Sequence, residues 1–267
     1  MLVDTHAHLG DEAFNADRVE VLRRARSSGV EWIIEIADSP KAWDSVLGFC
    51  ARTPCAEEPH VRCALGIHPY SAESFDADAA KRFRRLAEDE RVVAAGECGL
   101  DYARCAIPRA AQRRAFEGML SAAMDAGLPM IVHSRNAFPE TLEVLEAFYA
   151  SRPVRRRFRG VLHCFSGGHE EALRAVRLGF ALGADGPVTY PKNLALREAL
   201  LSAGLENIVL ETDAPYLPPQ SSRGRRNEPA AIAEIAAEIA QVFKTTPEQV
   251  AQASTRNAED LFQFKTE

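Results

Sequence analysis

Short apolar, β-branched runs alternate with longer amphipathic segments along the whole chain. Eight of these runs have the length and composition of buried strands, and a segment with helical spacing follows each of them. The predicted strands are residues 2–5, 31–36, 61–66, 92–96, 129–133, 160–164, 180–183 and 207–211. Strands that alternate with helices favour a parallel sheet, so eight such units predict a (β/α)8 TIM barrel of the α/β class.

The helical segments carry their own end signals. Segment 108–127 opens at a proline and closes at a glycine, which is the usual asymmetry of helix ends. The last segment follows a threonine and starts with proline and glutamate, a favourable cap and first turn. We expect helices at 18–28, 42–52, 77–88, 108–127, 228–243 and 247–262, with the last two on the outside of the barrel.

Length and composition favour one large domain. The chain has 267 residues and 46% hydrophobic content, and a barrel of this type needs about 250 residues. It contains no internal repeat, low-complexity segment or long linker, so we expect a single barrel domain over residues 1–267.

Net charge and cysteine content limit which binding partners and which cellular compartment we expect. A net charge of -6 argues against a general polyanion-binding surface, although bound cations and local arginines could still serve a nucleic-acid enzyme. Six cysteines without a Cys-x-x-Cys pair indicate reduced thiols. No run reaches the roughly 20 apolar residues of a membrane span. We expect a cytoplasmic protein with no membrane contact and no obligate protein partner.

Six side chains of metal-binding type fall at or near the ends of the predicted strands. Parallel barrel strands present such groups at their C-terminal mouth. In chain order these side chains are His6, His8, Glu97, His133, His163 and Asp213. Burying several carboxylates and imidazoles at one pole is costly unless cations are bound between them. The sequence therefore predicts a metal centre at the mouth.

Spacing within the strands adds detail to this centre. His6 and His8 are two residues apart, so both side chains leave the same face of one strand. Four imidazoles and two carboxylates are enough for two ions, and this mixture suits Zn, Mn, Ni or Fe. Glu97 is the best candidate for a bridge between the ions. Cys98 and Cys164 each follow a ligand, and strand alternation is expected to turn both thiols into the barrel–helix layer.

At this point the chain resembles a known family, the TatD-type metal-dependent deoxyribonucleases of the amidohydrolase-like barrels. The matching segments occur in the family's order and spacing over essentially the whole chain. They are Asp4-Thr-His-Ala-His-Leu9, Gly66-Ile-His-Pro69, Gly96-Glu-Cys-Gly-Leu-Asp-Tyr102, His133-Ser-Arg135, His163-Cys-Phe-Ser-Gly167, Glu211-Thr-Asp-Ala-Pro-Tyr-Leu217 and Arg223-Gly-Arg-Arg-Asn-Glu-Pro229.

The resemblance implies roles for individual residues. His6, His8, Glu97 and Asp213 would hold one divalent ion, and Glu97 would bridge to a second ion held by His133 and His163. The two ions could be Zn, Mg, Mn, Ni or Fe. Glu97 and Asp213 would be the catalytic carboxylates, with Asp213 accepting a proton from the attacking water.

Substrate contacts are expected from the loops at the mouth. His68 would approach a phosphate or an additional ion, and Arg135, Arg223 and Asn227 would bind phosphate oxygens. In the family a further histidine commonly follows the proline after His68, whereas this chain has Tyr70.

The implied activity is hydrolysis of DNA phosphodiester bonds, from a 3′ end, by a metal-bridged hydroxide. The substrate would be single-stranded DNA or a strand end. Binuclear barrels with these ligands also attack carbonyl carbon, so the alternative is an amide, ester or lactone hydrolase, including deacylation of aminoacyl-tRNA. A mouth loop rich in arginine and asparagine favours the nuclease.

Overall fold

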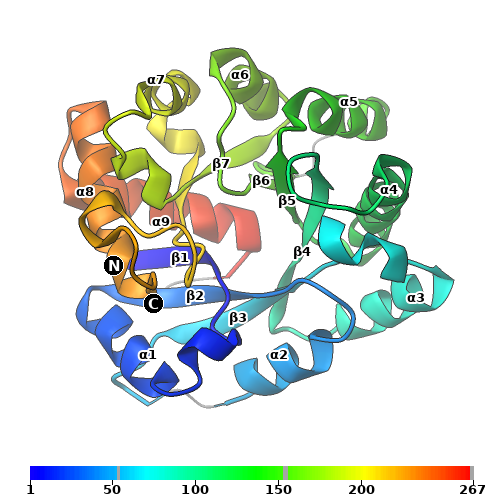
Figure 1. The fold of residues 1–267 in the computed structure, drawn as a ribbon, viewed down its shortest axis with the longest axis horizontal. Helices are drawn as coiled ribbons and strands as arrows, with labels where there is room; N and C mark the ends of the chain where they lie inside the picture. The colour runs from blue at the N-terminus through cyan, green and yellow to red at the C-terminus, as the bar shows by residue number, and fades with distance from the viewer. Residues whose placement is uncertain (53–54, 153–155, 265–267) are drawn as a thin grey trace.

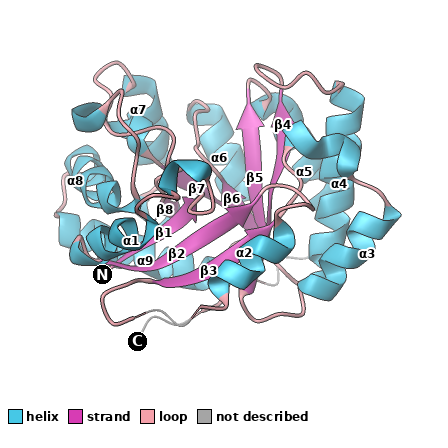
Figure 2. Ribbon diagram, turned by 60° about the horizontal axis from the view of Figure 1, so that its bottom comes forward, coloured by secondary structure: helices cyan, strands magenta, loops and turns pink. Residues whose placement is uncertain are grey.

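The computed structural model describes residues 1–52, 55–152 and 156–264 as a barrel of eight parallel strands inside a ring of helices. In Figure 1 helices α1 to α8 follow one another around the strands in chain order, and Figure 2 shows the strands enclosed by the helices. The strands are β1 Leu2–Ala7, β2 Val30–Ala37, β3 His60–Leu65, β4 Val92–Asp101, β5 Met130–Arg135, β6 Gly160–Leu162, β7 Phe180–Ala184 and β8 Ile208–Leu210. The predicted fold class is confirmed.

The helices alternate with these strands, and each forms where the sequence has an amphipathic segment. They are α1 Arg18–Ser27, α2 Trp43–Cys50, α3 Ala77–Leu86, α4 Arg109–Ala126, α5 Phe138–Tyr149, α6 His169–Arg177, α7 Leu194–Ala203, α8 Ile232–Phe243 and α9 Pro247–Phe262. In the described part of the chain, none of them has the length and apolar character that crossing a membrane requires.

Three strand ends differ from the sequence prediction in a way that matters for the site. Strand β4 runs five residues past its expected end, so Glu97 lies inside the strand. Strands β6 and β8 stop early, which leaves His163 and Asp213 in the loops that follow. The backbone is left-handed at Cys164 (φ +43°) and at Asp213 (φ +55°), so neither strand conformation extends through these residues.

Buried apolar side chains from all eight strands fill the barrel interior. They include Val3, Ile34, Ala64, Ala94, Ile131, Val161, Ala181 and Val209. The same cluster includes Ala258, Leu261 and Phe262 of α9. Helix α9 therefore packs against the base of the barrel, opposite the predicted site. The expectation that α9 is an outer helix was wrong, because its apolar face covers the open end of the strand interior rather than a strand's outer surface.

The seam between β1 and β8 closes the barrel through a few specific contacts. The backbone N–H of Asp213 donates to the carbonyl of His6, and the N–H of His8 donates to Ala214, at 2.9 and 2.8 Å. Below them, Asp4 accepts hydrogen bonds from the backbone and hydroxyl of Thr212, at 2.9 and 2.6 Å. Barrel closure and ligand placement therefore occur at the same residues.

Replacing Leu261 by alanine should destabilise the fold by about 2–5 kcal/mol, because it empties a fully buried position under the barrel. Urea unfolding followed by circular dichroism measures this change. Gln252→Ala, on the exposed face of the same helix, is the matched control and should stay within about 0.5 kcal/mol. Equal effects of the two substitutions would contradict the packing role of α9.

Candidate metal centre

All six predicted ligand side chains meet at the C-terminal mouth of the barrel. Strand β1 supplies His6, and His8 comes directly after its last residue. Strand β4 supplies Glu97, and β5 supplies His133. His163 and Asp213 come from the first residues after β6 and β8. Five of these side chains are buried, and only His8 is partly exposed.

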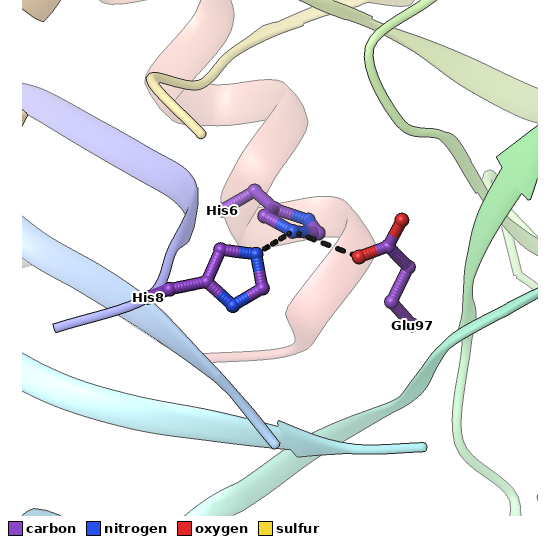
Figure 3. A group of neighbouring side chains, drawn as sticks. All are labelled: His6, His8 and Glu97. Carbon is purple, nitrogen blue, oxygen red and sulfur yellow. Dashed lines mark hydrogen bonds and ion pairs between the residues drawn. The ribbon is translucent and has the colours of Figure 1, made fainter. Parts of the chain in front are cut away.

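Glu97 lies at the centre of this cluster, and its two carboxylate oxygens face different imidazoles. Oε2 is 3.3 Å from Nε2 of His6, which in turn is 3.3 Å from Nε2 of His8, as Figure 3 shows. Oε1 contacts Nδ1 of His133 at 2.5 Å and lies 3.8 Å from Nε2 of His163. One carboxylate therefore joins two groups of nitrogen donors.

Asp213 completes the group around the β1 histidines. Its Oδ1 lies 3.4 Å from Nε2 of His8, 3.8 Å from Nε2 of His6 and 3.7 Å from Nε2 of His163. The left-handed conformation of Asp213 follows the end of β8, and strained backbone of this kind is common where a side chain must be aimed at a site.

His68 joins the second group. Its Nε2 lies 3.7 Å from Oε1 of Glu97, while its Nδ1 accepts the backbone N–H of Tyr70 at 3.2 Å. The side chain therefore both caps the turn that begins at Pro69 and faces the cluster.

The carboxylates and imidazoles of the cluster stabilise each other's charged forms. Burial disfavours the charged form of every member. The charges of His163 and His133 overcome this at Glu97 and hold its pKa well below the usual range. Burial likewise opposes protonation of His8 and His163, but Asp213 raises the pKa of His8 to about 9, and Glu211 raises that of His163 to about 10.

The donor set fits divalent metal ions. His6, His8 and Glu97 offer three ligand atoms within 4.8 Å of one another, and His68, Glu97 and His133 offer another such set. Imidazole and carboxylate donors together suit transition-metal ions. Protonated imidazoles balance the buried carboxylates in this arrangement, and a divalent cation could take over that balancing charge.

A layer of carboxylates behind the cluster positions it, and sequence reasoning missed most of these residues. Glu35 of β2 accepts the backbone N–H groups of Leu9 and Gly10 at 2.6 and 2.8 Å, which fixes the chain just after His8. Glu211 lies 3.0 Å from Nδ1 of His163. A glutamate within the apolar run of β2 was a signal for the first of these roles.

Asp101, also missed, organises the opposite side. Its Oδ2 lies 3.3 Å from Nε2 of His133, from the hydroxyl of Tyr70 and from Nη1 of Arg135. Its Oδ1 accepts the backbone N–H groups of Ala103 and Arg104 at 2.9 and 2.8 Å. This single buried carboxylate therefore connects a ligand histidine with an arginine and a tyrosine.

The two cysteines beside ligands behave differently. Cys98 is buried in the barrel–helix layer, as expected. The same expectation was wrong for Cys164, whose Sγ donates to Oδ2 of Asp185 at 2.8 Å and lies within 4.8 Å of ligand atoms of His163 and Asp213. The cause is the positive φ of Cys164, which breaks the strand alternation on which the expectation depended.

A cavity of about 500 Å³ opens above the cluster. Glu97, His133, His163 and Asp213 form part of its wall, together with the two predicted substrate contacts His68 and Arg135. Residues from the loops complete the lining: Asp11, Asp38, Tyr70, Arg104 and Tyr216 are among them. Arg104 is a cation at the cavity that the sequence did not single out.

Two other predicted substrate contacts do not line this cavity. Asn227 is buried, and its side-chain amide donates to the carbonyls of Thr212 and Tyr216 at 2.8 and 2.7 Å. The guanidinium of Arg223 lies 4.5 Å from the ring centroid of Tyr190 on the exposed side of the loop. Asn227 therefore anchors the loop that carries Tyr216, rather than presenting its amide to the cavity.

Comparison with known proteins agrees with this geometry. The family model of TatD-related DNases matches residues 3–263. The chain belongs to the TatD family.

Similar proteins cover the chain almost completely. The metal-dependent hydrolase YabD of Bacillus subtilis is 32% identical, with 99% of this chain and 100% of the relative covered. The 3′-5′ ssDNA/RNA exonuclease TatD of Pantoea ananatis is 33% identical, with 98% and 99% covered. The crystal structure of the TatD homologue YjjV from Escherichia coli superimposes with a TM-score of 0.89 at 29% identity, covering 99% and 98%. The chain is thus a metal-dependent hydrolase of the TatD family.

Protein freed of metal by a chelator should lose stability as pH rises from about 5 to about 9. Burial raises the pKa of Glu35 to about 7 and that of Asp185 to about 8, above the pKa values of these carboxyls in the unfolded chain. Ionising them in the folded protein costs free energy, so stability falls as pH rises from the unfolded to the folded pKa. The raised pKa of His8 acts in the same direction, because its protonated form is lost towards pH 9. Glu97 and Asp213, whose pKa values are lowered, lose their stabilising effect only at more acidic pH.

Thermal unfolding between these pH values measures the effect, and we expect Tm to fall by at least about 5 °C. Asp185→Asn should flatten the slope, because it removes one of the ionisations. A Tm that rises across the window would contradict this electrostatic account.

Asn227→Ala should lower the free energy of unfolding by about 1–3 kcal/mol, because it leaves two buried carbonyls without their donor. Arg223→Ala, in the same loop but exposed, should change it by less than about 0.5 kcal/mol. Urea titrations of both variants compare them directly. An unchanged midpoint for the Asn227 variant would argue against its anchoring role.

Proposed function

We propose that this protein hydrolyses phosphodiester bonds of single-stranded nucleic acid, with DNA as the expected substrate, stepwise from a 3′ end. The observation that carries the proposal is the position of Glu97 between two groups of nitrogen donors, below a cavity lined by arginines. A relative 33% identical over nearly the whole chain bears the name 3′-5′ ssDNA/RNA exonuclease, which supports this substrate class.

The donor groups favour two divalent ions. His6, His8 and Asp213, with Oε2 of Glu97, would hold one ion, and His133 and His163, with Oε1 of Glu97, would hold the other. Bound there, a pair of ions would lower the pKa of a water molecule and stabilise charge on the attacking and leaving oxygens. Glu97 would bridge the pair, which explains why it is the most central and most contacted carboxylate of the site.

Asp213 is the proposed proton acceptor. Its contacts with His8 and His163 outweigh the effect of burial and lower its pKa, so the carboxylate stays ionised and able to take a proton from water. It also lies in the cavity wall. The side chain is therefore both in the correct charge state and next to the space a substrate would occupy.

Arg135 and His68 are the proposed phosphate contacts. Arg135 lines the cavity and is held by Asp101 at 3.3 Å, which limits its freedom and directs its guanidinium. Guanidinium groups bind phosphate oxygens through paired N–H donors. His68 lines the cavity from the turn after β3, beside the second donor group.

Cleavage of 5′-end-labelled single-stranded DNA, with Mg, Mn or Zn added to chelator-treated protein, tests the proposal. The expected result is a ladder of products that shorten from the 3′ end. Glu97→Ala and Asp213→Ala should each reduce the rate by at least about 100-fold, because they remove the bridge or the proton acceptor. Asp125→Asn, an exposed change in α4, is the matched control and should leave the rate unchanged.

Intact DNA under every metal, with ions still bound to the protein, would overturn the nuclease proposal. Ester, lactone and aminoacyl-tRNA substrates would then be the next candidates, because the same donor set can activate water for attack on a carbonyl carbon.

A further inference from the structure

The cavity above the metal centre has opposite charges at its two rims. We define the acidic rim as Asp11, Asp38 and Tyr216, and the basic rim as Tyr70, Arg104 and Arg135; all six residues line the cavity. Each rim has one tyrosine whose side chain is about half exposed, with Tyr70 at 49% and Tyr216 at 51%. The two rims thus differ in charge but share an exposed aromatic ring.

The acidic rim is built on the loops after β1, β2 and β8. The hydroxyl of Tyr216 donates to Oδ2 of Asp11 at 2.8 Å. Asp38 also lines the cavity and is exposed, and no hydrogen bond or ion pair of its carboxylate is found in residues 1–52, 55–152 and 156–264. Burial and the neighbouring carboxylates raise the pKa of Tyr216 to about 12, so this hydroxyl stays protonated. The rim therefore presents negative charge and hydrogen-bond acceptors.

The basic rim is built on the ends of β4 and β5 and on the turn after β3. Asp101 fixes it from below, because its carboxylate contacts the side chains of Tyr70 and Arg135 and the backbone of Arg104. The negative charge of Asp101 is buried beneath these residues and is engaged by these contacts. The guanidinium groups of Arg104, which is exposed, and of Arg135, which is half-buried, give this rim its positive charge.

A continuous set of contacts places the metal centre between the rims. From the acidic side, the ring of Tyr216 packs 5.7 Å from that of His8, which contacts His6. From the basic side, the rings of Tyr70 and His68 are 4.6 Å apart, and Asp101 contacts His133. Glu97 joins the two sides. A phosphate above Glu97 would therefore have an acidic rim on one side and a basic rim on the other.

We propose that this charge difference sets the direction in which a strand enters and selects for a terminal hydroxyl group. The phosphates of the strand body would lie over Arg104 and Arg135, and the last nucleoside would lie at the acidic rim. There a terminal hydroxyl can donate a hydrogen bond to Asp38 or Asp11, whereas a terminal phosphate is repelled by them. This inference rests on the proposed nuclease function and deepens it.

The proposal gives a physical reason for attack from the 3′ end. Strands commonly carry a hydroxyl at the 3′ end and a phosphate at the 5′ end, so the acidic rim accepts the former and excludes the latter. The exposed rings of Tyr216 and Tyr70 can stack on bases either side of the scissile bond, a contact that tolerates any sequence.

The experiment compares kcat/KM for two 5′-labelled ten-nucleotide DNA strands that differ only in a 3′-hydroxyl or a 3′-phosphate. The wild-type protein should prefer the hydroxyl-ended strand by about tenfold, as expected for repulsion between nearby partly solvated charges. Asp38→Asn should reduce the preference about threefold, and the Asp11→Asn/Asp38→Asn double variant should reduce it further. Higher salt should also reduce the preference for the hydroxyl-ended strand, because it screens the repulsion between the charges.

Two controls separate the rim from general charge effects. Asp125→Asn makes the same chemical change in α4, where the carboxylate pairs with Arg84, and should leave the preference unchanged. Arg104→Gln should lower kcat/KM for both strands by the same factor, because it removes a contact to the strand body rather than to its end.

The outcomes distinguish this inference from the nuclease proposal. If both strands are cleaved equally by the wild type, or if Asp38→Asn keeps the full preference, the protein is a nuclease but the acidic rim does not read the strand end. If neither strand is cleaved under any metal, the nuclease proposal fails and this inference fails with it. Asp38 is exposed, so its variant is expected to fold normally, which unchanged thermal unfolding would verify.

Discussion

The first and last strands meet at a seam that closes the barrel. At the mouth, backbone hydrogen bonds from Asp213 to His6 and from His8 to Ala214 close the barrel. At the base, the side-chain amide of Asn257 in α9 donates to Ile208 at 2.7 Å. Residues about 200 positions apart in the chain become neighbours only through this closure. Residues of the candidate metal centre therefore also take part in closing the barrel.

Closure also concentrates charge that the fold must compensate. Carboxylates and imidazoles are buried side by side, and none of them would be ionised there in isolation. Glu97 receives charge from His133 and His163, while Asp213 is balanced by His8. An outer layer of carboxylates then fixes the orientation of these groups through backbone and imidazole contacts. Metal affinity and pH-dependent stability are consequently two aspects of one set of interactions.

The cavity above the candidate metal centre carries opposite charges on its two sides. Asp101 gathers Tyr70, Arg104 and Arg135 on one side, while Asp11 and Tyr216 form a pair on the other. The net charge of the whole chain, -6, gives no indication of this local separation of positive and negative side chains. For a substrate made of alternating phosphates and neutral groups, a charge difference across one cavity is a direct means of setting orientation.

Apolar periodicity and the placement of polar residues near strand ends are local properties, so the sequence alone predicted the eight strands, the barrel and the six clustered side chains of metal-binding type. It did not place α9 beneath the barrel, since an amphipathic pattern shows that a face is buried but not against what. Asn227 and Cys164 differ from the sequence expectation because of their backbone surroundings. The carbonyls of Thr212 and Tyr216 occupy the side-chain amide of Asn227. A left-handed backbone at Cys164 places its thiol near the candidate ligands His163 and Asp213. Arg104, Glu35 and Asp101 gained their roles only in three dimensions, because the strand ends and loops that surround them come from distant parts of the chain.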